Sequence, residues 1–157
     1  MTPELLTLLL DRGHTVATAE SLTSGMVGAR MAAISGASQV YKGGMITYSL
    51  RSKVDLLGTN RETTFSEDGV HPSIARKMAV SVAEKFGASI GIATTGYATP
   101  DPVLGYPRAW VAVADLTTGK VEICHLAISR ETDRTRAREK VCDKAFEMLW
   151  YLLSPSA

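Results

Sequence analysis

The sequence predicts an α/β fold, a three-layer α/β/α sandwich built on a mixed, mostly parallel sheet. Segments with helical apolar spacing alternate with short apolar runs typical of buried strands over residues 3–94. Two further strand-like runs, 110–114 and 121–128, flank a turn and favour an antiparallel hairpin in the same sheet. The chain has 157 residues, 45% apolar and 21% charged, which is ordinary globular composition, and we expect one domain over residues 1–157.

The first expected elements are a helix, a strand and a second helix. Five leucines at helical spacing predict a helix over residues 3–12, with a proline suited to its first turn and Gly13 suited to its cap. Residues 14–20 contain the run Thr-Val-Ala-Thr-Ala and predict a short buried strand. After Ser21, small and apolar residues at helical spacing predict a helix that packs closely on the sheet and ends at Gly36.

A second strand and a short helix are expected next. The strand covers residues 40–48, where Gly43 and Gly44 indicate a bulge or a close approach of another backbone. Ser49 is a favourable N-cap for the helix, and Gly58 is suited to end it.

The alternation continues in the middle of the chain. The polar stretch 59–71 predicts a short helix and a loop, and the amphipathic stretch 72–86 predicts a long helix. Residues 88–94 predict a buried strand that leads into a turn at Thr95 and Gly96.

The C-terminal part contains a loop, the hairpin and a final helix. Residues 97–107 contain three prolines, which predicts a loop. The last helix is expected over residues 131–153. It has an exposed apolar face that could belong to the core or to a subunit interface, formed by Phe146, Leu149 and Trp150.

Charge and composition argue against several classes of protein. The formal charge of +1 gives no global field that would attract nucleic acid or an acidic membrane, and no apolar run approaches the ~20 residues of a membrane span. The first residues lack the basic region of a secretory signal, and Cys124 and Cys142 are expected to be buried, reduced thiols, so we expect a cytoplasmic protein. The three histidines, His14, His71 and His125, show no ligand spacing, and no metal is expected.

Ser21 stands where a predicted strand meets a predicted helix. Its hydroxyl could do no more than cap that helix. Alternatively, the N–H groups of the first helical turn could hold a phosphate or a developing oxyanion. Glu20 adjoins Ser21, although its side chain need not point the same way. The small residues that permit a close approach are Thr23, Ser24 and Gly25.

Tyr48 and Lys53 form a second candidate pair. On one helix, two residues five positions apart would lie about 140° apart and could not share a face. If Tyr48 ends the strand and Ser49 caps the helix, both side chains can converge on the carboxyl edge of the sheet, where open α/β sheets bind ligands. Taken alone the pair is weak support for a site, because both placements are common.

Together the two segments resemble a known family. Thr-Ala-Glu-Ser-x-Thr-x-Gly at residues 18–25, followed by Thr-Tyr-Ser-x-x-x-Lys at residues 47–53, resembles the C-terminal domain of the CinA family, which also occurs alone as nicotinamide-nucleotide amidohydrolase. The resemblance covers nearly the whole chain and includes Arg134 and Arg138. It implies hydrolysis of the carboxamide of nicotinamide mononucleotide to nicotinate mononucleotide and ammonia.

The resemblance also implies residue roles. Ser21 matches the nucleophile, and Tyr48 and Lys53 match its activating partners. A lysine can act as the base only when it is neutral, which requires burial or a neighbouring positive charge. The expected ligand is a small-molecule nucleotide, with no cofactor, and we expect a homo-oligomer. The substrate-binding candidates are Glu20, Thr23, Ser24, Gly25, Gly44, Thr95, Gly96, Arg134 and Arg138.

The chain departs from the commoner family pattern around the expected pocket. Leu22 stands where Cys is usual, Ser24 where Gly is usual, and Leu-Arg-Ser replaces Asn-Glu-Ala before Lys53. The Gly-Ile-Ala-Gly-Pro loop becomes Gly-Tyr-Ala-Thr-Pro at 96–100, and Gly-Tyr-Pro-Arg-Ala at 105–109 replaces Lys-Pro-Val-Gly-Thr. Two alternatives therefore remain, a catalytically silent nucleotide-binding module and an amidase for a different amide. A short-chain dehydrogenase is excluded because that family separates Tyr and Lys by four positions.

Three arginines recur every fourth residue at the start of the last helix, at 130, 134 and 138. An arginine fork suits phosphate. The alternative is a solvated helix face, with the arginines paired to neighbouring acids. The acids available are Glu131, Asp133 and Glu139.

Overall fold

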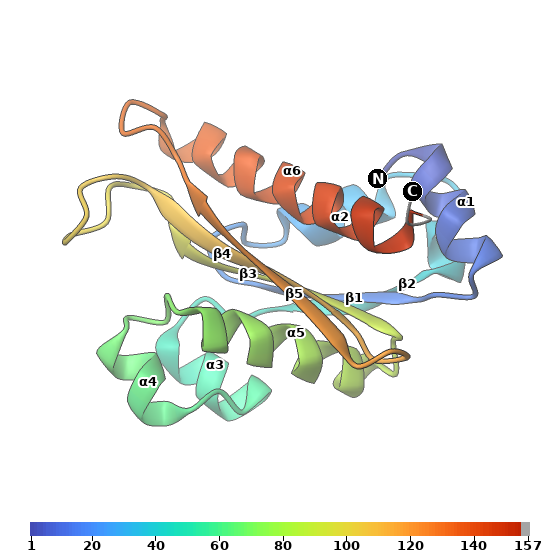
Figure 1. Cartoon of the computed structure of the whole chain (residues 1–157), viewed down its shortest axis with the longest axis horizontal. Helices are drawn as coiled ribbons and strands as arrows, with labels where there is room; N and C mark the ends of the chain where they lie inside the picture. The colour runs from blue at the N-terminus through green and yellow to red at the C-terminus, as the bar shows by residue number, and fades with distance from the viewer. Residues whose placement is uncertain (155–157) are drawn as a thin grey trace.

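The structure is a computed structural model that describes residues 1–154. A five-stranded sheet lies between two layers of helices (Figure 1). Helices α1 (Pro3–Asp11), α2 (Met26–Ala32) and α6 (Arg134–Leu153) cover one face. The other face is covered by α3 (Leu50–Leu57), α4 (Arg61–Ser66) and α5 (Pro72–Phe86). The predicted three-layer sandwich is confirmed.

The strands follow the order β2-β1-β3-β4-β5 across the sheet. Their bounds are Val16–Glu20 for β1, Tyr41–Ile46 for β2, Ile90–Tyr97 for β3, Arg108–Asp115 for β4 and Lys120–Ala127 for β5. The pairs of β1 with β2 and with β3 are parallel, whereas β3–β4 and β4–β5 are antiparallel. Only β4 therefore runs against the other four strands, and the sheet is mixed and mostly parallel in direction, as predicted.

Local signals predicted several element ends. Pro72–Phe86 has the predicted bounds, and the hairpin of β4 and β5 forms across the expected turn. The Ser49 side chain caps α3 by accepting from the N–H of Ser52, and Gly58 follows the helix in the left-handed region (φ 63°). The last helix begins at Arg134 rather than near residue 131, because the Asp133 side chain caps it there.

The turn predicted at Thr95 and Gly96 is wrong. Both residues stay within β3, where they pair with Trp110 and Ala109 of β4. A Cβ atom at Gly96 would lie 2.3 Å from the carbonyl oxygen of Arg108, so glycine permits this close approach of the two strands. The partner strand, which local sequence cannot reveal, extends β3 to Tyr97.

The two faces of the sheet carry side chains of different size. Alanines and a glycine of the sheet face α5, whereas valines and isoleucines face α1, α2 and α6. Helix α5 packs so closely that a Cβ at Gly91 would lie 1.9 Å from the carbonyl oxygen of Ala79. Small residues on this face therefore determine how near α5 lies to the sheet.

Several other predictions concern the core and its surroundings. Cys142 is buried, but Cys124 is only partly buried because it lies on the edge strand β5; both are free thiols. Leu149 is fully buried and Phe146 packs against the core, while Trp150 is 39% exposed. None of the helices in residues 1–154 combines the length and apolar character that crossing a membrane requires.

Candidate active site

The carboxyl ends of the three parallel strands meet at one pocket of about 370 Å³. Ser21 follows β1, Tyr48 follows β2, and Tyr97 ends β3. This is the edge at which open α/β sheets bind ligands. The lining residues are Ser21, Leu22, Tyr48, Ser49, Leu50, Lys53, Asp68, Val70, Thr95, Gly96, Tyr97, Ala98, Thr99 and Arg134.

Ser21 and Lys53 are in hydrogen-bond contact within this pocket. The Nζ atom of Lys53 lies 2.9 Å from Oγ of Ser21, and it also lies 2.8 Å from the carbonyl oxygen of Thr47 and 3.3 Å from that of Tyr48. A neutral amine has two hydrogens and one lone pair. The two carbonyls can accept the hydrogens, which leaves the lone pair for the hydroxyl proton of Ser21.

The environment of Lys53 favours the neutral amine. Its residue is only 2% exposed, and burial lowers the pKa of Lys53 from 10.5 to about 8, although the Asp68 carboxylate opposes part of this shift. At pH 7 about one molecule in ten then has a neutral Lys53, against about one in three thousand at the ordinary pKa. Burial thus supplies the condition that a lysine base requires.

Tyr48 lies at the mouth of the pocket, not beside the Ser21 hydroxyl. Its residue is 55% exposed, and its phenol oxygen accepts a hydrogen bond of 2.9 Å from Nη2 of Arg134. In the described chain no hydrogen bond joins the phenol to Ser21 or Lys53; it is the backbone carbonyl of Tyr48 that contacts the lysine. A ligand that enters the pocket can therefore contact the Tyr48 phenol before it reaches Ser21 or Lys53.

Thr95 and Gly96 line the pocket from the end of β3. The Thr95 hydroxyl donates a 2.5 Å hydrogen bond to the carbonyl oxygen of Gly69, so it ties the turn before α5 to the sheet. A Cβ at Gly69 would lie within 3.3 Å of the Lys53 side chain. The turn therefore packs directly on the buried stem of the lysine.

Glu20 and Thr23, which the sequence predicted to bind substrate, do not line the Ser21 pocket. The Glu20 carboxylate is buried and accepts the N–H groups of Gly25, Val27 and Gly28 together with the Thr23 hydroxyl. These are the orphan donors at the start of α2. The carboxylate therefore occupies the anion position that the sequence suggested for a substrate phosphate.

One of the two roles predicted for Ser21 was to cap the helix that follows it. Ser21 does not cap α2. The chain makes a turn from Ser21 to Gly25, and α2 begins at Met26 with Gly25 in the left-handed region (φ 93°). The turn moves the helix away from β1 because the short segment first wraps around the Glu20 carboxylate. Ser21, 7% exposed, consequently faces the pocket.

Gly25 and Gly44 line a different hollow, of about 190 Å³, between α2 and β2. There a hydrogen bond of 2.9 Å joins the hydroxyls of Thr18 and Tyr41. A Cβ at Gly44 would lie 2.1 Å from Oγ1 of Thr18, so the glycine leaves room for that pair. The structure therefore does not bring these two glycines to the Ser21 pocket.

Arg138 and Ser24 lie beside a shallow recess next to the main pocket, which Leu22, Tyr48 and Arg134 also line. The guanidinium of Arg138 donates to the carbonyl oxygens of Leu22 and Thr23 at 2.8 and 2.9 Å. It fixes the turn that follows Ser21. The predicted row of arginines is incomplete, because Arg130 precedes α6 and is exposed.

The sequence reasoning missed Asp68 and Tyr97. Both line the pocket, and the Tyr97 hydroxyl donates a 2.9 Å hydrogen bond to the Asp68 carboxylate. Asp followed by Gly is a common turn signal, but no local pattern places this turn beside Lys53. Among residues 1–154, no three side chains of His, Cys, Asp or Glu gather as a metal-binding group.

Comparison with known proteins identifies relatives over almost the whole chain. A family model described as the CinA C-terminal domain matches residues 1–153. A protein of Halothermothrix orenii is 35% identical over 150 residues, and one of Geobacillus kaustophilus is 37% identical over 144 residues; both have the provisional name competence-damage inducible protein. The alignments cover 96% and 90% of this chain but only 36% and 35% of those relatives, so the chain spans about a third of their length.

Solved structures give the same result for the fold. A competence/damage inducible protein of Agrobacterium tumefaciens superposes with a TM-score of 0.89 at 28% identity, over 96% of this chain and 92% of that one. A competence or damage-inducible protein of Enterobacter asburiae gives a TM-score of 0.86 at 27% identity, over 96% and 97% of the two chains.

Proposed function

This chain belongs to the CinA C-terminal domain family, and on that premise we propose that it is an amidohydrolase. The proposed reaction converts nicotinamide mononucleotide to nicotinate mononucleotide and ammonia. The observation that supports it best is the contact of 2.9 Å between Lys53 Nζ and Ser21 Oγ in a pocket. A serine hydroxyl is a poor nucleophile, and a neutral amine at this distance can activate it.

The first half of the reaction forms an acyl-enzyme. The Ser21 oxygen attacks the carboxamide carbon, and its proton passes to Lys53 Nζ. The resulting tetrahedral intermediate has a negative oxygen. When the C–N bond breaks, the Lys53 ammonium donates that proton to the departing nitrogen, which leaves as ammonia.

The second half returns the enzyme to its starting state. Water attacks the ester carbon while the neutral Lys53 takes a proton from it. The C–Oγ bond breaks, and Ser21 recovers its proton from Lys53. The carboxylic acid formed then loses its proton to solvent, and the product leaves as a carboxylate. One buried lysine therefore serves as base and acid in both halves.

The backbone N–H of Leu22 is suited to the negative oxygen of the intermediate. It belongs to the residue directly after the nucleophile, and among the described residues it donates to no protein acceptor. An N–H in that position supplies half of the oxyanion hole in many serine hydrolases. Arg138 holds the Leu22 carbonyl, which belongs to the next peptide group, and so restrains the turn that carries this N–H.

The mouth of the pocket is suited to the anionic end of a nucleotide. Arg134 lines it and is exposed, and its guanidinium already contacts the Tyr48 phenol. A guanidinium fork suits phosphate, and the phenol can add a hydroxyl donor. The pocket volume of about 370 Å³ lies within the range of small-molecule sites.

The test is to supply purified protein with nicotinamide mononucleotide and to measure ammonia and nicotinate mononucleotide together. Lys53→Ala should lower kcat by about 10²–10⁴-fold, the range for loss of an acid–base partner. Ser21→Ala removes the nucleophile and should lower kcat further, by about 10⁶-fold. Ser66→Ala and Lys42→Ala are matched controls at exposed positions outside the pocket and should keep full activity. Equal loss in the controls, or turnover that survives both active-site changes, would reject the mechanism.

A second candidate is a nucleotide-binding module without turnover. The altered loop at 97–109 favours it, because Thr99 adds a side chain to the pocket wall where the family commonly has glycine. This candidate predicts that the nucleotide raises the melting temperature while no ammonia is released. A panel of other carboxamides separates it from an amidase with a different substrate.

A further inference from the structure

Asp68 is the single acid among the pocket's lining residues, all of which lie in the described part of the chain. The other ionic side chains there are the cations Lys53 and Arg134. Arg134 lies at the mouth with Tyr48, whereas Asp68 lies on the turn that packs against Lys53. Asp68 and Arg134 are both exposed, so the pocket lining has one accessible acid on the side of Lys53 and one accessible cation at the mouth.

The backbone holds Asp68 in an unusual conformation. Its φ of 48° lies in the left-handed region, and Gly69 continues there with φ 72°. Such a conformation costs a non-glycine residue free energy and persists only where the surroundings enforce it. Three hydrogen bonds fix the turn: from the Gly69 N–H to the Thr64 carbonyl, from the Val70 N–H to the Glu67 carbonyl, and from the Thr95 hydroxyl to the Gly69 carbonyl.

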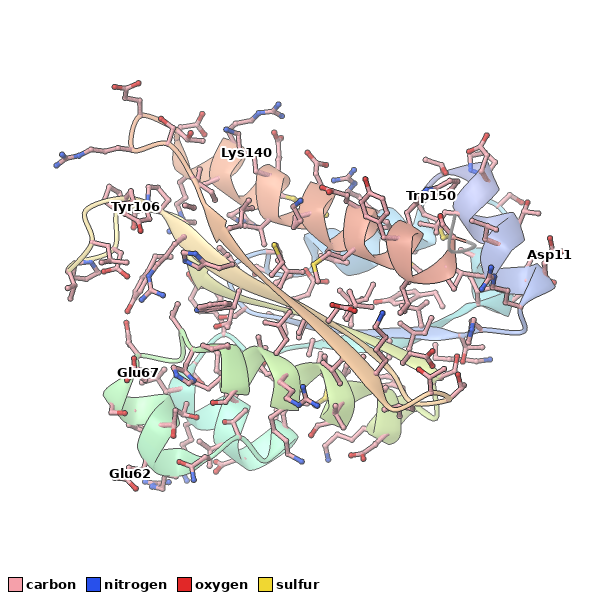
Figure 2. The ribbon with its side chains drawn as sticks, in the orientation of Figure 1. Asp11, Glu62, Glu67, Tyr106, Lys140 and Trp150 are labelled. Carbon is pink, nitrogen blue, oxygen red and sulfur yellow. The ribbon has the colours of Figure 1, made fainter. Side chains whose placement is uncertain are left out.

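Tyr97 positions the Asp68 carboxylate. Its hydroxyl donates to one carboxylate oxygen at 2.9 Å, and among the described residues the second oxygen accepts no hydrogen bond. Figure 2 labels Glu67, beside Asp68, and Tyr106, on the loop after β3; both lie at the same end of the molecule. The hydrogen bond itself joins the turn before α5 to the end of β3, two segments 29 positions apart in the chain.

The altered loop holds Tyr97 in turn. The guanidinium of Arg108 lies 5.7 Å from the centre of the Tyr97 ring and forms a 2.5 Å ion pair with Asp101. Asp101 is buried and also accepts the N–H groups of Val103 and Leu104. Arg108, which departs from the commoner family pattern, thus links Tyr97 to the buried carboxylate of Asp101.

We propose that Asp68, positioned by Tyr97, makes the pocket select a carboxamide over the corresponding carboxylate. A carboxamide NH₂ group can donate a hydrogen bond to the free Asp68 oxygen. A carboxylate has no donor to offer, and its charge is repelled by that of Asp68. Asp68 is therefore a specificity-determining residue that favours binding of the amide and release of the acid formed from it.

This inference rests on the proposed function, since it assumes that a carboxamide lies near Ser21. Equilibrium binding can nevertheless test it without turnover. The Ser21→Ala variant removes the nucleophile, and calorimetry then measures the affinities for two pairs of probes. The pairs are nicotinamide mononucleotide with nicotinate mononucleotide, and nicotinamide with nicotinate.

The variants to compare in that background are Asp68→Asn, Asp68→Gly, Tyr97→Phe and the control Glu67→Gln. Asp68→Asn should reduce the ratio of amide to acid affinity by about tenfold, which equals about 1.4 kcal/mol. Asp68→Gly should give a similar reduction and tolerates the left-handed backbone, so it guards against a folding defect. Tyr97→Phe should give a smaller reduction, and Glu67→Gln, an exposed acid outside the pocket, should give none.

Each outcome decides the question. A ratio unchanged by both Asp68 variants, or equal losses for amide and acid, overturns the inference. Failure of both pairs to bind overturns it together with the proposed function. Amide-selective binding that the Asp68 variants abolish, in a wild-type protein that releases no ammonia, supports the inference and rejects the proposed hydrolysis.

Discussion

Lys53 has the least favourable environment of the charged side chains that line the pocket. It is 2% exposed, and its three hydrogen-bond contacts are two carbonyls and one hydroxyl, with no carboxylate in direct contact. Burial therefore lowers the pKa of Lys53 to about 8. A side chain that is costly to bury and whose amine contacts a serine hydroxyl in a pocket is more consistent with the proposed chemistry than with support of the fold.

The pH dependence of the proposed reaction follows from this pKa. Only neutral Lys53 can accept the Ser21 proton, so kcat/KM should rise with pH, with a midpoint near the pKa of about 8, and then level off. Steady-state rates of ammonia release from pH 6 to 10 measure the midpoint. A rate that is flat across this range, or that falls as pH rises, would contradict a lysine base.

The lowered pKa of Lys53 also predicts that the stability of the protein depends on pH. Its folded-state pKa of about 8 lies below its unfolded value of 10.5, so the unfolded chain binds more protons and stability increases between these pH values. Lys53→Met should raise the free energy of unfolding at pH 7 by about 1–3 kcal/mol, since the shift corresponds to about 3 kcal/mol and two carbonyl contacts are lost. Urea unfolding of the wild type and of Lys53→Met at pH 7 and pH 10 measures this difference in the free energy of unfolding.

That gain should shrink as pH rises above 8 and be nearly absent at pH 10.5, while activity is lost at every pH. Lys42→Met, at an exposed position of β2, is the control and should change stability little. A lysine variant less stable than the wild type at pH 7 would show that the contacts outweigh the burial cost.

Among the elements, helix α2 depends on a side chain that precedes it by six residues. Glu20 ends β1 and accepts the N–H groups of Gly25, Val27 and Gly28 around the first turn of the helix. A carboxylate there satisfies orphan donors and interacts favourably with the helix dipole. The polar turn after Ser21 therefore folds around an anion that the chain itself supplies.

Replacing the Glu20 carboxylate with an amide of nearly the same volume should destabilise the protein. Glu20→Gln places an NH₂ group against N–H donors and should lower the free energy of unfolding by about 1–3 kcal/mol. Thermal or urea unfolding measures the change. Glu62→Gln, in the exposed first turn of α4, is the matched control and should stay within about 0.5 kcal/mol of wild type.

Helix α6 acts on the site through Arg138. The two hydrogen bonds from its guanidinium hold the Leu22 and Thr23 carbonyls. Arg138→Ala should lower kcat by about tenfold or more with the fold retained, because a misplaced oxyanion donor weakens transition-state binding. Arg136→Ala, which removes only an exposed ion pair with Glu139, should leave kcat unchanged; equal effects would mean that α6 acts through general stability.

For the whole molecule, ligand binding should appear as added stability. The pocket is formed by the ends of three strands together with α3, the turn before α5 and the first turn of α6. Nicotinamide mononucleotide at 100 times its Kd should stabilise the Ser21→Ala protein by about 2.7 kcal/mol. Thermal unfolding should show a rise of roughly 5–10 °C, and an unchanged melting temperature would contradict nucleotide binding.

Self-association of the chain, expected from the sequence, stays a prediction. Apolar side chains of different parts of the surface are exposed, among them Ile46 on the edge strand β2 and Tyr151 on α6. We propose a homo-oligomer, and light scattering coupled to size-exclusion chromatography measures its mass. A monomer at micromolar concentration would reject that proposal.

The sequence by itself determined the elements whose signals are local. Helical apolar spacing with a proline and a glycine predicted Pro72–Phe86, and Ser49 and Gly58 predicted the ends of α3. The alternation of elements predicted the three layers, and two short motifs indicated the family and named Ser21, Tyr48 and Lys53. These properties depend on neighbours in the chain, so they can be found without coordinates.

Only the tertiary structure decided which of the candidate residues meet. It placed Ser21 and Lys53 in contact, moved the Tyr48 phenol to the mouth, and used Glu20 to cap α2. It also joined Asp68 to Tyr97 across 29 positions of sequence. Strand order, the burial of an amine and the direction of a side chain depend on segments that lie far apart in the chain, and local patterns do not contain that information.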